Sequence, residues 1–467
     1  MSGRSAQYRR TGLVIVLAVL TLTVGSGIVA ASNVAAGLSE RSVGIPIPLW
    51  LVLATGSVFV AASALLTPFG GGHGRAERFH HRTVGLHVDR LRRVGSLVLG
   101  VLGLAALAFI VTVGLVGPQI GSFSAAVLVT FVVGRALLTI VAYTVGNPWY
   151  ALNPWRRIAT RLPNGYVSYP DRLGSWPAVG ALLVLVWLEL VLPVSSSPRM
   201  LVTVILAYST FTIGGAVAVG PDTWFRNADP ISVWFRLYGA LAPVGRTEDG
   251  LELRYPGARV RDDDVVTDVS AAAFVLALVW SVTYSGLIVT RPGIRTVEAL
   301  VGIGLAPELV YFGLLVVGFA LFLTVYWAAV VSTRRRTETR LSRRDVAVRF
   351  APPLLAIAAG AHFAHYVGFT ISLWPSLIDT LIAPFNPPEN PNQYLLPAWF
   401  GFVEIAGILC GHVLAVWLSY AVSLECAAGK QWTIRTLLPV LTLIACLTLV
   451  SLALVSLPPT EAVYVTN

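Results

Sequence analysis

Three histidines within apolar stretches have the clearest capacity for chemistry in this sequence. His362 and His365 lie in "GAHFAHYVGF" (360–369), and His412 lies in a second apolar stretch. Residues three apart share one face of a helix, so His362 and His365 should be neighbours. Three imidazoles can hold a divalent metal such as zinc and leave one position for a water, whose pKa the metal lowers. Water activated in this way hydrolyses esters.

Two other interpretations of these histidines stay open. Two imidazoles on facing helices can clamp a haem b group between them. Alternatively, all three side chains form hydrogen bonds between helices and bind no ligand. The spacing of His362 and His365 does not choose among a metal, a haem and a structural role.

Arg135 and Glu404 are charged side chains in apolar surroundings, where a charge is costly and faces protein or water. Arg135 is permanently charged and needs a partner. The candidate partners are Glu189, Glu308 and Glu404. Arg135 is either half of a structural ion pair or an anion-binding guanidinium in a catalytic site, where it engages a phosphate or a carboxylate. Glu404, eight residues before His412, is the candidate catalytic base or the partner of a metal ligand.

The composition indicates that membrane-spanning helices position these residues. The 467-residue chain is 56% hydrophobic and 12% charged, whereas soluble domains are about 25% charged. A span needs about 20 mostly apolar residues. Eleven stretches qualify: 12–32, 46–68, 95–117, 121–145, 177–194, 200–220, 269–290, 302–331, 350–382, 396–424 and 433–457. The expected fold is all-α, a polytopic transmembrane bundle of about 11 spans that forms a single membrane domain over residues 1–467.

The first of these stretches, 12–32, allows a second interpretation. Arg9 and Arg10 precede it, as in a secretory signal peptide that is cleaved. Its apolar run is long for a signal peptide, which favours a span. The predicted topology is the same in either case.

Positive charge is distributed unevenly between the two sides of this bundle. With the N-terminus inside, 28 of the 33 basic residues fall in inner segments and 4 in outer segments, while Arg135 lies within a span. This asymmetry follows the positive-inside rule and predicts an outer C-terminus in a multi-pass plasma-membrane protein. The net charge of +10 therefore reflects topology and a lipid partner, and it does not indicate nucleic-acid binding.

The inner segments 69–94, 146–176, 221–268 and 332–349 carry this charge. The first holds four histidines among arginines, which predicts a solvated loop facing lipid headgroups rather than a metal site. The second repeats Asn-Pro-Trp in "GNPWYALNPWRR", which predicts turns with tryptophan at the membrane interface.

The third inner segment predicts two local structures. Asp229 and Pro230 suit the cap and first turn of an amphipathic helix near 230–242 that lies flat on the inner leaflet. The charged residues after it predict a small hairpin around Asp249 and Gly250. The chain contains no phosphate-binding loop, no GxSxG and no HExxH, which argues against ATP-driven chemistry.

The predicted spans bring the three histidines to one depth. His362 and His412 each lie about 13 residues, or about 20 Å, from the ends of their spans, which is near the midplane. The short outer connection between these two spans favours antiparallel neighbours. A site shared by His362, His365 and His412 is therefore geometrically feasible.

The sequence resembles a family of polytopic prokaryotic membrane proteins whose members are often labelled fenitrothion hydrolase, an organophosphate ester hydrolase. The matching stretches are "IPIPLW" (45–50), "NPWYALNP" (147–154), "YPDRLGSWPAVGALLVLVWLEL" (169–190), "DPISVWFRLYGALAPVGR" (229–246), "AHFAHY" (361–366) and "CGHV" (410–413). The resemblance implies that His362, His365, Tyr366 and His412 belong to the family's histidine-bearing pair of spans. Tyr420 and Ala421 stand where members carry His-Asp, and "NVAAGLSERSVG" lacks the histidine that members carry beyond the first span.

Three functions are consistent with these residues. The first is a metal-dependent ester hydrolase with a midplane histidine site, as the resemblance implies. The second is a transporter for a small or anionic solute, which fits many spans with buried charges and no soluble domain. The third is an electron-transfer subunit that carries haem b.

Overall fold

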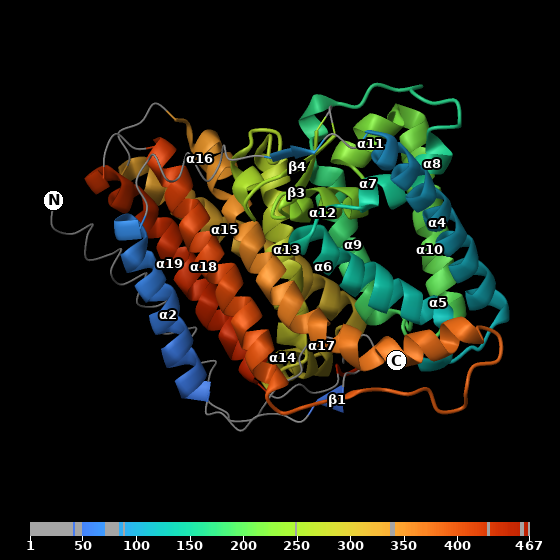
Figure 1. Ribbon diagram of the computed structural model, residues 1–467. Helices are drawn as coiled ribbons and strands as arrows, with labels where there is room; N and C mark the ends of the chain where they lie inside the picture. Colours follow the sequence, from blue (N-terminus) through green and yellow to red (C-terminus); the bar gives the residue numbers. More distant parts are fainter. Residues whose placement is uncertain are drawn as a thin grey trace.

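The computed structural model describes residues 41–42, 49–70, 84–86, 89–247, 250–336, 341–426, 430–457 and 462–465, and these residues are mostly helical (Figure 1). The predicted span 12–32 and most of the histidine-rich segment 69–94 lie outside the described residues. Within them, eight helices are long and apolar enough to cross a membrane, and two shorter apolar helices cover Trp50–Leu66 and Trp176–Val191. The expected all-α membrane bundle is confirmed at this level, while the number of spans and their sidedness stay predictions.

Long helices follow the predicted apolar stretches closely. They are α2 (Leu49–Gly70), α4 (Asp89–Val116), α9 (Trp176–Val191), α10 (Pro198–Val219), α13 (Val269–Ile288), α15 (Pro307–Arg336), α17 (Leu355–Ile382), α18 (Phe400–Cys426) and α19 (Lys430–Ser456). One further stretch is composite: α5 (Ala125–Leu128), the π-helical segment η3 (Val129–Leu137) and α6 (Leu138–Thr144).

Short helices occupy the connections. They are α7 (Trp149–Leu152), α8 (Pro154–Ala159), α11 (Pro221–Asn227), α12 (Pro230–Gly239), α14 (Arg291–Gly302) and α16 (Arg343–Phe350), with single turns η2 (Gly121–Phe123), η4 (Asp171–Leu173), η5 (Ala258–Arg261) and η6 (Pro352–Leu354). Each Asn-Pro-Trp motif starts one of them. The Asn147 side chain accepts from the Trp149 amide (2.9 Å), and the Asn153 side chain accepts from the Arg156 amide (3.0 Å).

Each of two small sheets joins segments that the charge pattern assigns to the same side of the membrane. Strands β3 (Val244–Thr247) and β4 (Gly250–Leu253) form the predicted hairpin, and β2 (Val84–Leu86) extends it antiparallel to β4. Strand β1 (Arg41–Ser42) pairs in parallel with β5 (Leu395–Leu396). The first sheet joins two predicted inner segments and the second joins two predicted outer segments, which agrees with the predicted alternation of the spans.

Helix α12 begins as predicted, and most of its apolar face packs inside the protein, while its placement at the inner leaflet stays a prediction. The Asp229 side chain accepts from the Ser232 amide (2.8 Å), and Pro230 occupies the first turn. Val233 and Tyr238 are fully buried, because α12 packs on α6, α9 and α11 within the protein. The sequence pattern identified the helix correctly, but periodicity does not distinguish a lipid-facing stripe from a protein-facing one.

Helices α17 and α18 cross closely at two glycines. A Cβ atom on Gly411 would lie 2.4 Å from the Ala356 carbonyl oxygen and 3.0 Å from Gly360 Cα. Small residues allow two membrane helices to approach at van der Waals contact. Gly360 and Gly411 therefore face each other across this interface.

Helices α9 and α10 follow one another in sequence but pack on different partners. Helix α9 packs on α12, α13 and α15, whereas α10 packs on α4, α8 and α11. Figure 1 shows α4 and α10 standing apart from α9, with α5, η3 and α6 crossing below the space between them. At one end the connections touch, since the Gly121 amide donates to the Ser196 carbonyl (3.0 Å).

Candidate functional site

The three candidate histidines are buried, and each contacts a different part of the bundle. His362 lies against Tyr143 of α6, with Nδ1 3.3 Å from the hydroxyl oxygen. His365 bonds to the backbone of Val282 on α13. His412 Nδ1 bonds to the Ile408 carbonyl one turn earlier (2.9 Å), while its Nε2 lies toward the Leu447 backbone of α19 without hydrogen-bonding geometry.

Helical rotation explains why these rings diverge. Gly360 and Gly411 face each other between α17 and α18. His412 follows Gly411 directly and is turned about 100° away from this interface, while His362 is turned about 200° from Gly360. The three residues share a depth along the sequence, but their side chains leave the helices in different directions.

A metal or haem site of these three residues therefore does not fit the structure. Among the described residues, no group of three His, Cys, Asp or Glu side chains is arranged to hold a metal ion. The ring of His362 faces Tyr143 of α6, whereas that of His412 lies toward α19, so they cannot clamp one haem. Glu404 is buried on α18, two turns before His412, and the residues that the structure describes gather no metal-ligand set around it.

An aromatic cluster surrounds His362 instead. Its ring stacks on Tyr366 (4.5 Å between centroids) and meets Tyr143 and Tyr238 at 5.8 and 6.0 Å. Burial raises the pKa of the Tyr238 phenol, so this hydroxyl is neutral at physiological pH. The cluster binds α17 to α6 and α12.

Arg135 forms an ion pair with Glu189, one of its three predicted partners. Nη1 of Arg135 donates to the Glu189 carboxylate, and Nε donates to the Tyr366 hydroxyl (2.6 Å). Arg135 lies in the π-helical segment η3. Such turns are rare in proteins, and those that occur are often found at functional sites. The ion pair joins three elements, η3, α9 and α17.

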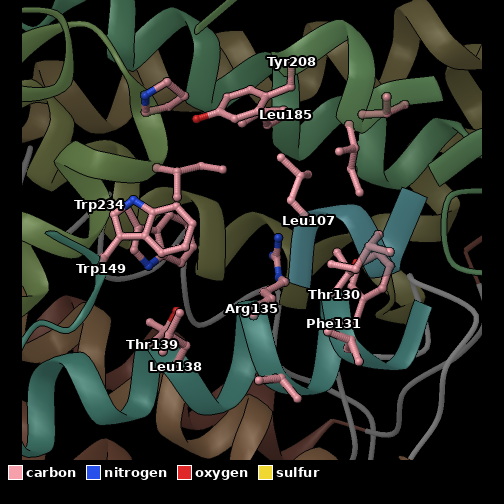
Figure 2. Close-up of a pocket in the computed structure, with 18 of the residues that line it drawn as sticks. Leu107, Thr130, Phe131, Arg135, Leu138, Thr139, Trp149, Leu185, Tyr208 and Trp234 are labelled. Carbon is pink, nitrogen blue, oxygen red and sulfur yellow. The ribbon is translucent and has the colours of Figure 1, made fainter. Parts of the chain in front are cut away.

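Arg135 and Glu189 also line a pocket inside the bundle. The cavity has a volume of about 350 Å³ and lies between the α4–α10 wall and the α9–α12 wall, above η3. Figure 2 shows the Arg135 side chain reaching from η3 into the middle of this cavity. The side chains of Arg135 and Glu189 keep 23% and 19% of their surface exposed, so a ligand in the pocket can contact both.

Aromatic side chains from the short helices close one part of the pocket. Trp149 stacks on Phe235 (4.9 Å, 16°), and Trp155 meets the Tyr208 ring edge-on (4.9 Å, 84°). The Trp155 indole donates to the Ser209 hydroxyl (2.7 Å), which fixes α8 against α10. Trp234 lies beside Trp149 in Figure 2 and completes this aromatic wall.

Sequence reasoning did not identify these aromatic residues as parts of a site. The repeated Asn-Pro-Trp motif was the available signal, since it places two tryptophans at the starts of two adjacent helices. Tryptophan at a turn is also typical of the membrane interface, so the motif alone is consistent with either the membrane interface or an internal pocket. The structure assigns Trp149 and Trp155 to the pocket.

Comparison with protein-family models, curated proteins and solved structures finds no match for this chain. The resemblance to fenitrothion hydrolases stays a prediction, and the function has to be argued from the pocket.

Proposed function

We propose that this multi-pass membrane protein binds a small, largely apolar solute in the pocket around Arg135 and carries it through the bundle. The observation that supports this proposal is a cavity of about 350 Å³ among apolar helices, with an ion pair exposed to it. Ligand pockets typically have volumes from about 300 Å³ upward and combine apolar walls with a few polar groups. Discontinuous or irregular helices are common at the binding sites of transporters, and η3 is such a segment.

The arrangement of the histidines favours a carrier over the other two predicted functions. A metal-dependent hydrolase needs a gathered ligand set, and a haem protein needs two axial ligands that face each other. In the described residues the histidines are used in contacts between helices or within one helix. The pocket, in contrast, needs no cofactor to bind a solute.

A pocket-filling substitution tests the proposal. Purified protein is assayed for binding of radiolabelled octanol and octanoate, and proteoliposomes are assayed for uptake of the same probes. Leu185→Trp adds a large side chain to the pocket lining and should abolish binding of both probes. Val184→Trp is the matched control, since the adjacent Val184 is 41% exposed on the outside of α9 and should leave binding unchanged.

Thermal unfolding of both variants separates a filled pocket from a misfolded protein. If Leu185→Trp melts near the wild-type temperature and still binds both probes, the pocket is not the binding site. If wild-type protein binds neither probe, the proposed function is wrong.

A further inference from the structure

The pocket contains one positive and one negative side chain in an apolar enclosure. Apart from Arg135 and Glu189, the ionisable group among its lining residues is the Tyr208 phenol. Two opposite charges persist in such surroundings because each neutralises the other. The empty pocket therefore has a net charge of zero.

An entering anion would upset this balance. Arg135 would then face two negative groups, and an uncompensated charge in a low-dielectric site costs several kcal/mol. Protonation of Glu189 removes the excess charge, because a carboxyl group without its counter-ion is more stable in the neutral form when buried. The proton must come from water, because the Tyr208 hydroxyl already donates to the buried Asp229 carboxylate and the lining holds no other acid that could supply one.

Few other ionisable groups near Glu189 could bind the proton in its place. The Arg135 guanidinium of η3 and the Tyr366 phenol of α17 interact electrostatically with the Glu189 carboxylate. From α12, Tyr238 acts on Arg135. On α13 and α15, which pack on α9, the Tyr284 hydroxyl donates to the Tyr311 carbonyl (2.9 Å) and the Tyr311 hydroxyl to Val463 (2.7 Å).

Arg135 is anchored in a way that permits a change of partner. Its Nε atom donates to the Tyr366 hydroxyl (2.6 Å), and its backbone carbonyl contacts His362 Nε2 (3.3 Å). Neither contact involves Nη1, which binds Glu189. The guanidinium can therefore exchange one carboxylate for another while its own position is kept.

We propose that the pocket takes a carboxylate with an apolar tail, and that each carboxylate enters with one proton that binds Glu189. This inference rests on the proposed function. The ligand carboxylate replaces Glu189 at Arg135 Nη1, and the Glu189 carboxylate accepts a proton from water. No covalent bond of the ligand changes. The pocket then holds the Arg135 cation, the ligand anion and a neutral Glu189, so its net charge is again zero.

Proton uptake on binding tests this coupling directly. Octanoate is added to purified protein in weak buffer with a pH indicator, and octanol serves as the neutral probe. We expect about one proton taken up per octanoate and none per octanol. Octanoate affinity should fall, by up to about tenfold per pH unit, as the pH rises from neutral to alkaline, while octanol affinity stays constant.

Two substitutions at Glu189 make the test specific. Glu189→Gln leaves Arg135 without a counter-ion, so octanoate should bind without proton uptake and with no pH dependence in this range. Glu189→Asp keeps a carboxylate and should keep the proton uptake. Thermal unfolding verifies that both variants are folded.

The outcomes separate this inference from the proposed function. Octanoate binding without proton uptake in the wild type, or equal uptake in Glu189→Gln, overturns the coupling alone. Binding of octanol but not of octanoate also overturns the coupling alone. Binding of neither probe overturns both proposals.

The same assay distinguishes the two sources of such a ligand. Palmitate resides in the bilayer, whereas octanoate is delivered from water. If palmitate in nanodiscs displaces labelled octanoate with the same proton uptake, the pocket is loaded from the lipid. If octanoate binds with a proton and palmitate does not displace it, the pocket is loaded from water, and the coupling holds in both cases.

Discussion

The Nε2 atom of His362 lies 3.3 Å from the backbone carbonyl oxygen of Arg135. A carbonyl oxygen accepts only, so Nε2 carries the proton and donates it. Nδ1 is then an acceptor for the Tyr143 hydroxyl, 3.3 Å away. Both nitrogens of this ring are occupied by protein partners, and the ring holds the π-helical segment from which Arg135 enters the pocket.

His362→Phe should therefore affect the pocket rather than a metal. Phenylalanine keeps the stacking on Tyr366 but loses both hydrogen bonds, which we expect to cost about 1–3 kcal/mol of stability. Octanoate binding should weaken because Arg135 loses a backbone contact. Thermal unfolding and the binding assay provide the measurements. His412→Phe is the control, since its bond to Ile408 lies within α18 and octanoate binding should not change. An equal loss of bound metal in both variants, measured by mass spectrometry, would instead indicate a shared metal site.

The ion pair in the pocket should be more important for stability than an ion pair at the surface. Arg135→Met leaves Glu189 without its counter-ion, and breaking a buried pair costs about 3–5 kcal/mol. Arg135→Met combined with Glu189→Met should recover most of this loss. Arg156→Met is the comparison, because its partner Asp222 is 91% exposed and such pairs contribute about 0–1 kcal/mol. Thermal unfolding of the four proteins measures these differences, and equal effects of the two arginine variants would contradict the expectation.

The contact between α17 and α18 should not tolerate a methyl group. In Gly411→Ala the new Cβ would lie 2.4 Å from the Ala356 carbonyl oxygen, so the helices must separate. We expect a loss of about 1–3 kcal/mol, as for other overpacked sites. Gly313→Ala on α15 meets nothing within 4 Å and should be neutral or slightly stabilising. The melting temperatures of the two variants measure this difference. Similar values would show that α17 and α18 accommodate the methyl group without loss of stability.

Cysteine labelling in cells tests the predicted sidedness. The native Cys410, Cys426 and Cys446 are first replaced by serine. Asn390→Cys lies in a predicted outer loop and should react with a membrane-impermeant maleimide in intact cells. Ser168→Cys lies in a predicted inner loop and should react only after permeabilisation. Both native residues are exposed in the structure, so accessibility to the reagent depends on the side of the membrane. Reversed labelling would invert the predicted topology.

Much of the fold could be predicted from local features of the sequence. Apolar stretches indicated ten of the described long or composite helices, and Asp229 with Pro230 indicated the start of α12. The Asp249-Gly250 turn signal correctly predicted the hairpin, whose strands end and begin at Thr247 and Gly250. Each of these features depends on residues close in sequence. The partner of Arg135 was narrowed to three glutamates because a buried guanidinium requires a carboxylate.

The candidate site could not be predicted because it depends on how each helix is rotated. Hydropathy gives the length of an apolar helix but not the direction of its side chains. His362 and His412 were predicted at one depth, yet the contact between Gly360 and Gly411 turns them apart. The pocket depends on α9 and α10 packing on different neighbours, and no local pattern in their sequences reports that arrangement.

The separation of α9 from α10 also makes the surrounding lipid part of the binding equilibrium. The wall of α4, α8, α10 and α11 packs on α5, α7 and α12 but not along α9, and the connections near Gly121 and Ser196 touch at one end. Any displacement of this wall must push acyl chains aside, and a bilayer of different thickness opposes such a displacement with a different force. The rate at which the pocket exchanges its contents should therefore depend on the mechanical properties of the membrane, and the same protein should work at different speeds in thin and thick bilayers.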